Sequence, residues 1–195
     1  MDQFEKSLRE LTLTPYLLKA TALIGRGRRQ GGNQFRHCWE VCGVLIDYKY
    51  TDPVILKASI IHDLFEDADD MPGISREEII RIDSDGLAVY ELVMEVTKKK
   101  ENGIFEDKHV FLERIMKTGS RQAKILKMAD RIANLISSDR KEKKRKIILE
   151  TEKYILPYAE AVNEQMYKEL KDLIRIKNKE IALLKFLDRP LFGFF

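Results

Sequence analysis

Apolar residues recur every three or four positions along almost the whole chain, which is the spacing of an amphipathic α-helix. Helix-start signals separate these segments. Thr14-Pro15, Asn33 and Asp52-Pro53 each offer a capping side chain or a proline in the first turn. Ser75 and Glu78 have the spacing of a capping box. Since no segment alternates with the β-branched and aromatic density of a strand, the pattern predicts an all-α fold.

The pattern predicts helices over residues 14–25, 33–48, 54–65, 87–97, 108–116, 120–138, 142–156 and 158–187, with a short helix after Ser75. Asn102-Gly103 predicts a loop, and Pro157 predicts a kink or break. A length of 195 residues predicts one domain over 1–195, with a core at about 15–165 and a C-terminal helix and apolar tail over 166–195. The tail, Pro190–Phe195, would dock on the body or pair two subunits in a homo-oligomer.

Composition excludes several classes of protein. The chain has 35 basic and 32 acidic residues, and a net charge of +3 does not argue for a nucleic-acid partner. The basic run Arg140–Lys146 is interpreted as a solvated helix face. The longest uncharged stretch, Leu11–Leu18, has eight residues against the roughly 20 of a membrane span, and no signal peptide is evident. Cys38 and Cys42 are interpreted as small core residues, which with these exclusions predicts a cytoplasmic protein.

The chain has three histidines, and one of them stands in an unusual acidic setting. His62-Asp63 follows the apolar run Ala58–Ile61, where an ionisable pair is costly to bury unless it is paired or binds a metal. Glu66 and Asp67 follow three and four residues after Asp63, so a helix would place all four side chains within a turn and a half. A polar helix end is the alternative interpretation of this segment.

Two further residues could complete a metal site. His37 lies above the apolar face of the preceding helix, and Asp130 interrupts an amphipathic helix. Alone, the first fits a core histidine and the second fits half of a salt bridge. Together with His62 and Asp63, they offer two imidazoles and two carboxylates from separate helices. Such a mixed set suits Mn²⁺, Fe²⁺ or Zn²⁺.

The order His37, His62-Asp63, Asp130 resembles the H…HD…D signature of the HD superfamily. The surrounding segments resemble more narrowly the Rel/SpoT-type alarmone hydrolases, in a small hydrolase-only form. Four segments carry this likeness, which covers about residues 17–161. They are Arg28–Gly31, Ala58–Ala68 (ASIIHDLFEDA), Val96–Lys98 (VTK) and Lys127–Asn134 (KMADRIAN). The resemblance implies an all-α HD-domain helical bundle.

The resemblance also implies roles for individual residues. The metal ligands, for a manganese ion, would be His37, His62, Asp63 and Asp130. The catalytic pair that handles water and protons would be Glu66 and Asp67. The substrate-binding residues would be Arg28, Arg29, Lys98, Asn134 and Ser137.

The activity implied is hydrolysis of the 3′-pyrophosphate of ppGpp or pppGpp to pyrophosphate and GDP or GTP. The sequence departs from the family pattern around the pocket. Asn33–Phe35 and Cys38 flank His37 differently, and Ile155 takes the place of a pocket tyrosine although Tyr154 is adjacent. The alternatives are therefore a phosphohydrolase that acts on the adenine alarmone ppApp or the 2′-phosphate of NADPH, and a non-catalytic nucleotide-binding module.

Overall fold

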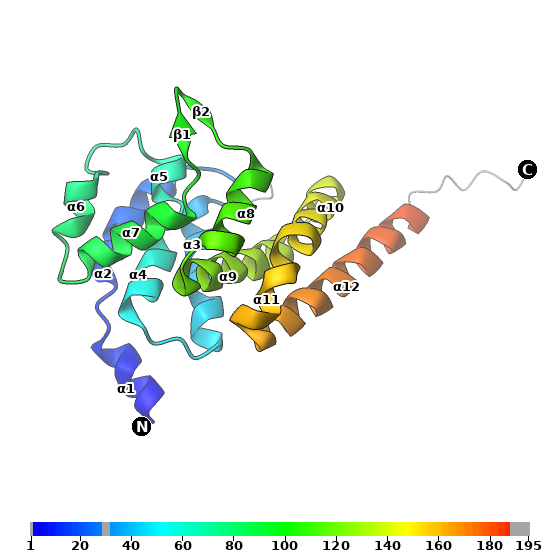
Figure 1. Cartoon of the computed structure of the whole chain (residues 1–195), viewed down its shortest axis with the longest axis horizontal. Helices are drawn as coiled ribbons and strands as arrows, with labels where there is room; N and C mark the ends of the chain where they lie inside the picture. The colour runs from blue at the N-terminus through cyan, green and yellow to red at the C-terminus, as the bar shows by residue number, and fades with distance from the viewer. Residues whose placement is uncertain (1, 29–31, 188–195) are drawn as a thin grey trace, which may run out of the picture.

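The computed structural model describes residues 2–28 and 32–187. Arg29 and the tail Pro190–Phe195 lie outside the described residues. Within them the chain is helical almost throughout, which confirms the predicted all-α class, and the only strands form one short hairpin (Figure 1). No helix in this part of the chain is long and apolar enough to span a bilayer.

The described residues of the N-terminal half form seven helices and one 3₁₀ turn. They are α1 (Gln3–Glu10), α2 (Thr14–Ala20), the 3₁₀ turn Thr21–Leu23, α3 (Gln34–Asp47), α4 (Pro53–Ile61), α5 (Leu64–Asp67), α6 (Arg76–Ile80) and α7 (Gly86–Val96). The caps expected at Asn33 and Asp52 are present: the Asn33 side chain accepts from the Arg36 amide at 2.9 Å, and Asp52 accepts from the Val54 amide at 2.9 Å. These caps determine where α3 and α4 begin. Thr14 is instead the first residue of α2, which has no side-chain cap.

The second half begins with the hairpin and ends in a long helix. Its elements are β1 (Lys100–Glu101), β2 (Ile104–Phe105), α8 (Lys108–Thr118), α9 (Arg121–Ser137), α10 (Lys141–Glu150), the π-helical turn Thr151–Ile155, α11 (Leu156–Val162) and α12 (Glu164–Leu187). Asn102 and Gly103 have φ angles of 50° and 79°, the left-handed pair that a tight hairpin turn requires. The sequence predicted only a loop here because strands of two residues are too short to show alternation.

The prediction of one helix over 158–187 was wrong. Pro157 lies in the first turn of α11, where its missing N–H is not needed, so it follows the π-helical turn without ending the helix. The break falls at Asn163, which has an extended backbone. Its side chain accepts from the Met166 amide at 2.9 Å and so caps α12.

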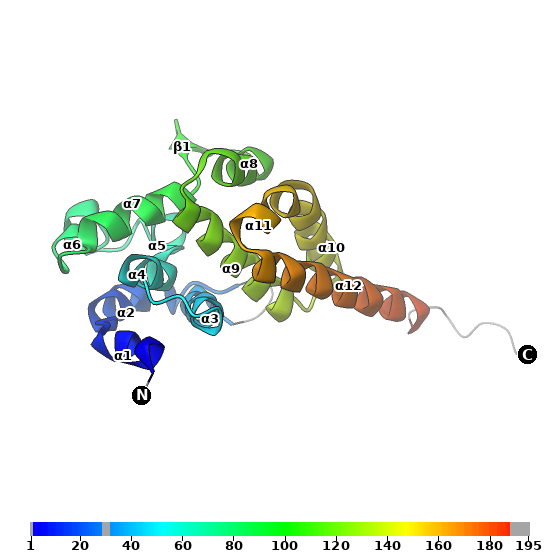
Figure 2. The same cartoon turned by 60° about the horizontal axis from the view of Figure 1, so that its bottom comes forward.

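Helix α9 is the centre of the bundle. It packs against α3, α4, α7 and α8 on one side and α10, α11 and α12 on the other, and both views show it between these groups (Figures 1 and 2). Consequently even its charged residues Lys127, Asp130 and Arg131 are buried. Charged groups enclosed in this way need specific partners, and these partners lie at one end of the bundle.

Another buried charged residue, Lys57 of α4, lies away from these residues of α9. Its Nζ atom donates to Asp83 at 2.8 Å and to Asp85 at 2.6 Å, and the Tyr16 hydroxyl also donates to Asp83 at 2.8 Å. These bonds tie α4 to the turn before α7 and to α2. A buried charge held by several partners is costly to disrupt, because removing one member leaves the others unpaired.

Replacing Lys57 with methionine should therefore lower the free energy of unfolding by about 2 kcal/mol. The measurement is urea unfolding at neutral pH. Lys19→Met is the matched control, since Lys19 is more exposed than Lys57 and pairs with the exposed Glu78 at 2.6 Å. Loss of this surface ion pair should lower the free energy of unfolding by less than about 1 kcal/mol. Equal unfolding midpoints for the two variants would contradict a structural role for the Lys57 cluster.

Candidate metal and phosphate site

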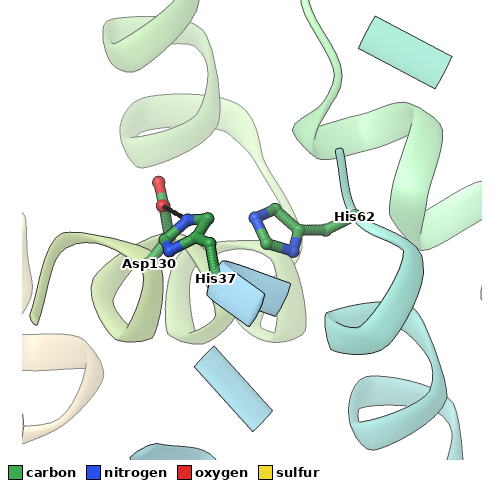
Figure 3. Close-up of side chains that lie close together, drawn as sticks. All are labelled: His37, His62 and Asp130. Atoms are coloured by element: carbon green, nitrogen blue, oxygen red, sulfur yellow. Dashed lines mark hydrogen bonds and ion pairs between the residues drawn. The ribbon is translucent and has the colours of Figure 1, made fainter. Parts of the chain in front are cut away.

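Two histidines and an aspartate converge where α3, the end of α4 and α9 meet, as Figure 3 shows. His37, His62 and Asp130 each offer a ligand atom, and these atoms lie within 4.8 Å of one another. All three residues are buried, and the two imidazole rings stand edge to face with centroids 5.4 Å apart. The cluster joins residues that are 93 positions apart in the sequence.

The end of α4 orients His62. His62 is the C-cap residue, and its Nδ1 lies 2.8 Å from the carbonyl oxygen of Ser59, so Nδ1 carries the proton and donates it. The other ring nitrogen, Nε2, becomes an acceptor when the ring is neutral. It is buried and has no hydrogen-bond partner among the described residues. A backbone carbonyl that fixes the tautomer in this way is the usual outer partner of a metal-binding histidine.

The geometry of His37 fits a cation as well. Its Nε2 lies 3.0 Å from Oδ1 of Asp130, and two acceptors can be that close only when a proton or a metal ion lies between them. Its Nδ1 is buried, lies 3.8 Å from a Glu40 oxygen and has no hydrogen-bond partner in the part of the chain that the structure describes. Buried, unpaired ring nitrogens beside carboxylates are the donor set that a divalent transition metal accepts.

Asp63 and Cys38 lie beside this cluster, next to His62. Oδ1 of Asp63 is 3.3 Å from Nε2 of His62. Cys38, His62 and Asp63 form a second group whose ligand atoms lie within 4.8 Å of one another, and both cysteines are free thiols. All four residues predicted as metal ligands therefore lie together.

The charges in this cluster hold each other in the ionised form. Burial lowers the pKa of His62, but the carboxylate of Asp63 and the thiol of Cys38 together outweigh burial and raise that pKa to about 9. Burial raises the pKa of Asp130, but Lys127 and His37 outweigh it and hold that pKa well below its usual range. Without a metal, the cluster therefore retains protons on its imidazoles that a bound cation would displace.

A polar cavity of about 300 Å³, called the inner cavity here, opens beside these ligands. Glu66 and Asp67, predicted as the catalytic pair, both line it. Lys98 donates to Glu66 twice, from its backbone N–H at 2.8 Å and from Nζ at 2.9 Å. Asp67 accepts from Gln34, and burial, with Asp63 nearby, raises the pKa of its carboxyl group.

The residues predicted to bind substrate have mixed placements. Arg28, Lys98 and Asn134 line the inner cavity, and Arg28 donates to the Asn134 side chain at 2.7 Å. Ser137 lies almost one turn beyond Asn134, donates to the carbonyl of Ala133 at 2.8 Å and does not line the inner cavity. Arg29 lies outside the described residues.

A second cavity of about 650 Å³, called the outer cavity here, continues from the inner one along α10. Arg140, Lys143 and Lys146 line it, and Arg140 and Lys146 are exposed, so part of the predicted solvated face over Arg140–Lys146 also forms one wall of a cavity. The three residues are spaced three apart, which places them along one face. The three-residue spacing of these basic residues is visible in the sequence. That they lie near the acidic residues of the metal cluster is decided only by tertiary packing.

The sequence comparison placed Ile155 where the family has a pocket tyrosine, but in the structure the adjacent residue, Tyr154, lines a cavity. Ile155 is fully buried in the core, whereas Tyr154 lines a third cavity together with Lys108 and Lys146. The π-helical turn over Thr151–Ile155 contains both residues. Because a π turn inserts one extra residue, it changes which side chain faces outward.

Comparisons with known proteins support the fold. No protein-family model matches the sequence, and no curated protein does. Among solved structures, the chain is similar to a metazoan ortholog of SpoT that hydrolyzes ppGpp and plays a role in starvation responses. The two share 21% of their sequence over 85% of this chain and 94% of the other, with a TM-score of 0.69. This likeness establishes that the two proteins share a fold, which is the predicted HD-type helical bundle.

Proposed function

We propose that this chain is a divalent-metal-dependent phosphohydrolase that removes the 3′-pyrophosphate of a guanosine polyphosphate. The observation that carries the proposal is the buried cluster of His37, His62 and Asp130, with unpaired ring nitrogens beside a polar cavity. The shared fold with a ppGpp-hydrolyzing protein supports the choice of substrate. The products would be pyrophosphate and GDP or GTP.

His37, His62, Asp63 and Asp130 would hold the cation, and we propose Mn²⁺ because the set mixes imidazole and carboxylate donors. When bound, such an ion lowers the pKa of water and polarises a phosphoryl oxygen. The reaction would take place in the cytoplasm. Whether two copies associate stays a prediction.

The chain's own residues would have two further roles, which are to transfer protons and to bind the phosphate groups. Glu66 is held in place by Lys98 and lines the inner cavity, so it would orient water and accept its proton. Asp67 retains a proton more readily than an exposed aspartate and would deliver one to the leaving oxygen. Lys98 and Arg28 would bind the phosphate oxygens and balance the charge that develops on them.

The first test removes one proposed ligand. Asp63→Ala should abolish both Mn²⁺ binding and turnover, because it deletes a carboxylate and leaves His62 without its neighbouring charge. Metal binding is measured by titration followed by electron paramagnetic resonance, independently of activity. Asp69→Ala is the control, since Asp69 is an exposed acid of the same region and should bind metal normally. Retained activity in the Asp63 variant would overturn the mechanism.

The second test separates proton handling from metal binding. Glu66→Gln should lower kcat by about 10² to 10⁴ while Mn²⁺ binding stays within twofold, because an amide cannot take up the proton. Steady-state kinetics with ppGpp gives kcat and KM. Glu101→Gln, on the exposed strand β1, should leave both unchanged. A drop in metal affinity that matches the drop in kcat would instead place Glu66 among the ligands.

The third test identifies the substrate. A panel of ppGpp, pppGpp, ppApp and NADPH, each with Mn²⁺, is assayed separately for pyrophosphate and orthophosphate. We expect pyrophosphate from the guanine alarmones. Release of orthophosphate from NADPH, or cleavage of ppApp alone, would overturn the guanine substrate but keep the proposed metal site. Binding of a nucleotide without turnover would favour the non-catalytic module.

A further inference from the structure

The outer cavity is lined mainly by cations. Six basic side chains face it, Lys98, Lys108, Arg131, Arg140, Lys143 and Lys146, against three acids. Of the acids, Asp130 belongs to the proposed metal cluster, Glu150 pairs with Arg131 at 2.9 Å, and Glu142 lies on the exposed side of α10. A concave surface with an excess of positive charge concentrates anions.

Arg131 shows that the cavity is built for a ligand rather than merely being charged. It is 3% exposed, and its Nη1 atom donates to Glu150. Its Nε and Nη2 atoms are buried and have no partner among the described residues. Leaving two charged N–H groups without an acceptor is costly, and a planar guanidinium with two free donors matches an oxyanion such as phosphate.

Lys108 adds a second incompletely balanced cation. Within residues 2–28 and 32–187, no carboxylate forms an ion pair with its Nζ atom, which instead lies 5.0 Å from the centre of the Phe111 ring. Burial lowers the pKa of Lys108 to about 7, and the charges of Arg131 and Lys127 contribute to this shift. An anion in the cavity would oppose that repulsion and favour the charged form of Lys108.

The outer cavity is continuous with the site of the proposed reaction. The two cavities share five lining residues: Lys98, Lys108, Asp130, Asn134 and Lys143. The inner cavity, at about 300 Å³, is at the lower end of the range for ligand pockets, so a nucleotide with phosphate groups at both ends would need more room. The outer cavity supplies that room in the direction of α10.

We propose that the outer cavity is a second anion site, which binds the 5′-polyphosphate of the nucleotide whose 3′-pyrophosphate lies beside Asp63. Arg131 and Lys108 form its base, and Lys146, Lys143 and Arg140 form its outer wall along α10. This assignment of the 5′ end rests on the proposed function; the anion site itself does not. A free polyphosphate anion has the same chemistry, and the two sources are separated below.

The anion site is tested without catalysis. Binding of inorganic tripolyphosphate to the full chain is measured by calorimetry in buffer without divalent cations, so that the anion cannot bind through a metal. The double variant Lys108→Gln/Lys146→Gln should weaken binding about tenfold or more, the loss expected for two charge-assisted contacts. Lys117→Gln, on the same helix as Lys108 but paired with Glu113 in solvent, should bind like the unmodified chain.

Two results would overturn the anion site. One is equal binding by the double variant and the unmodified chain, and the other is loss of binding in Asp63→Ala, which would locate the anion at the metal ligands. Thermal unfolding of each variant checks that the fold is kept. Should the double variant unfold, Arg140→Gln at the exposed start of α10 provides the same comparison and should weaken binding about threefold or more.

The 5′ assignment is tested by kinetics. In the double variant, the KM for ppGpp should rise about tenfold, while the KM for guanosine 3′-diphosphate, which has no 5′ phosphates, should change less than about twofold. Unchanged KM values for both substrates would assign the site to a free anion, and an equal rise for both would place the two lysines against the nucleoside or the 3′-pyrophosphate; either result overturns the 5′ assignment. If neither nucleotide is hydrolysed by the unmodified chain, the proposed function fails while the calorimetric result still decides the anion site.

Discussion

Two imidazoles and a carboxylate are buried together at the meeting point of α3, α4 and α9, and the rest of the structure accommodates this constraint. Buried ionisable groups are tolerated only when they are paired or bind a metal. Here the groups come from three helices, so the bundle must be assembled before the contact between His37 and Asp130 can form. The central position of α9 follows from this, because Asp130 has to reach His37 from the middle of the core.

Charges of both signs lie around this cluster. Carboxylates lie beside His37 and His62, Lys127 pairs with one of them, and further lysines and arginines line the two cavities. A divalent cation is attracted to the carboxylates and phosphate oxygens to the basic residues. Since both groups are partly buried, their interactions are stronger than those of exposed surface charges. This arrangement matches a substrate with phosphate groups that bridges a metal and a basic wall.

Lys98 lies between α7 and the short hairpin and helps to position Glu66. Arg114 of α8 donates to the carbonyl oxygens of Glu95 and Thr97, at 2.9 Å each, and so closes the end of α7. Lys98 follows directly, and its backbone and side chain both reach Glu66. The position of a proposed catalytic carboxylate thus depends on an arginine that lines neither the inner nor the outer cavity.

Sequence patterns determined the helices, their caps and most of the proposed metal and catalytic residues, because helical periodicity and the His62-Asp63-x-x-Glu66-Asp67 spacing are local properties. The break at Asn163 was missed because Pro157 was the stronger local signal for a helix end. In the structure Pro157 lies in the first turn of α11, and the chain leaves the helix at Asn163. Only the folded chain decided that Arg140, Lys143 and Lys146 border a cavity and that Ser137 does not line the inner one. Whether a charged helix face meets solvent or a ligand depends on what packs opposite it, and no local spacing contains that information.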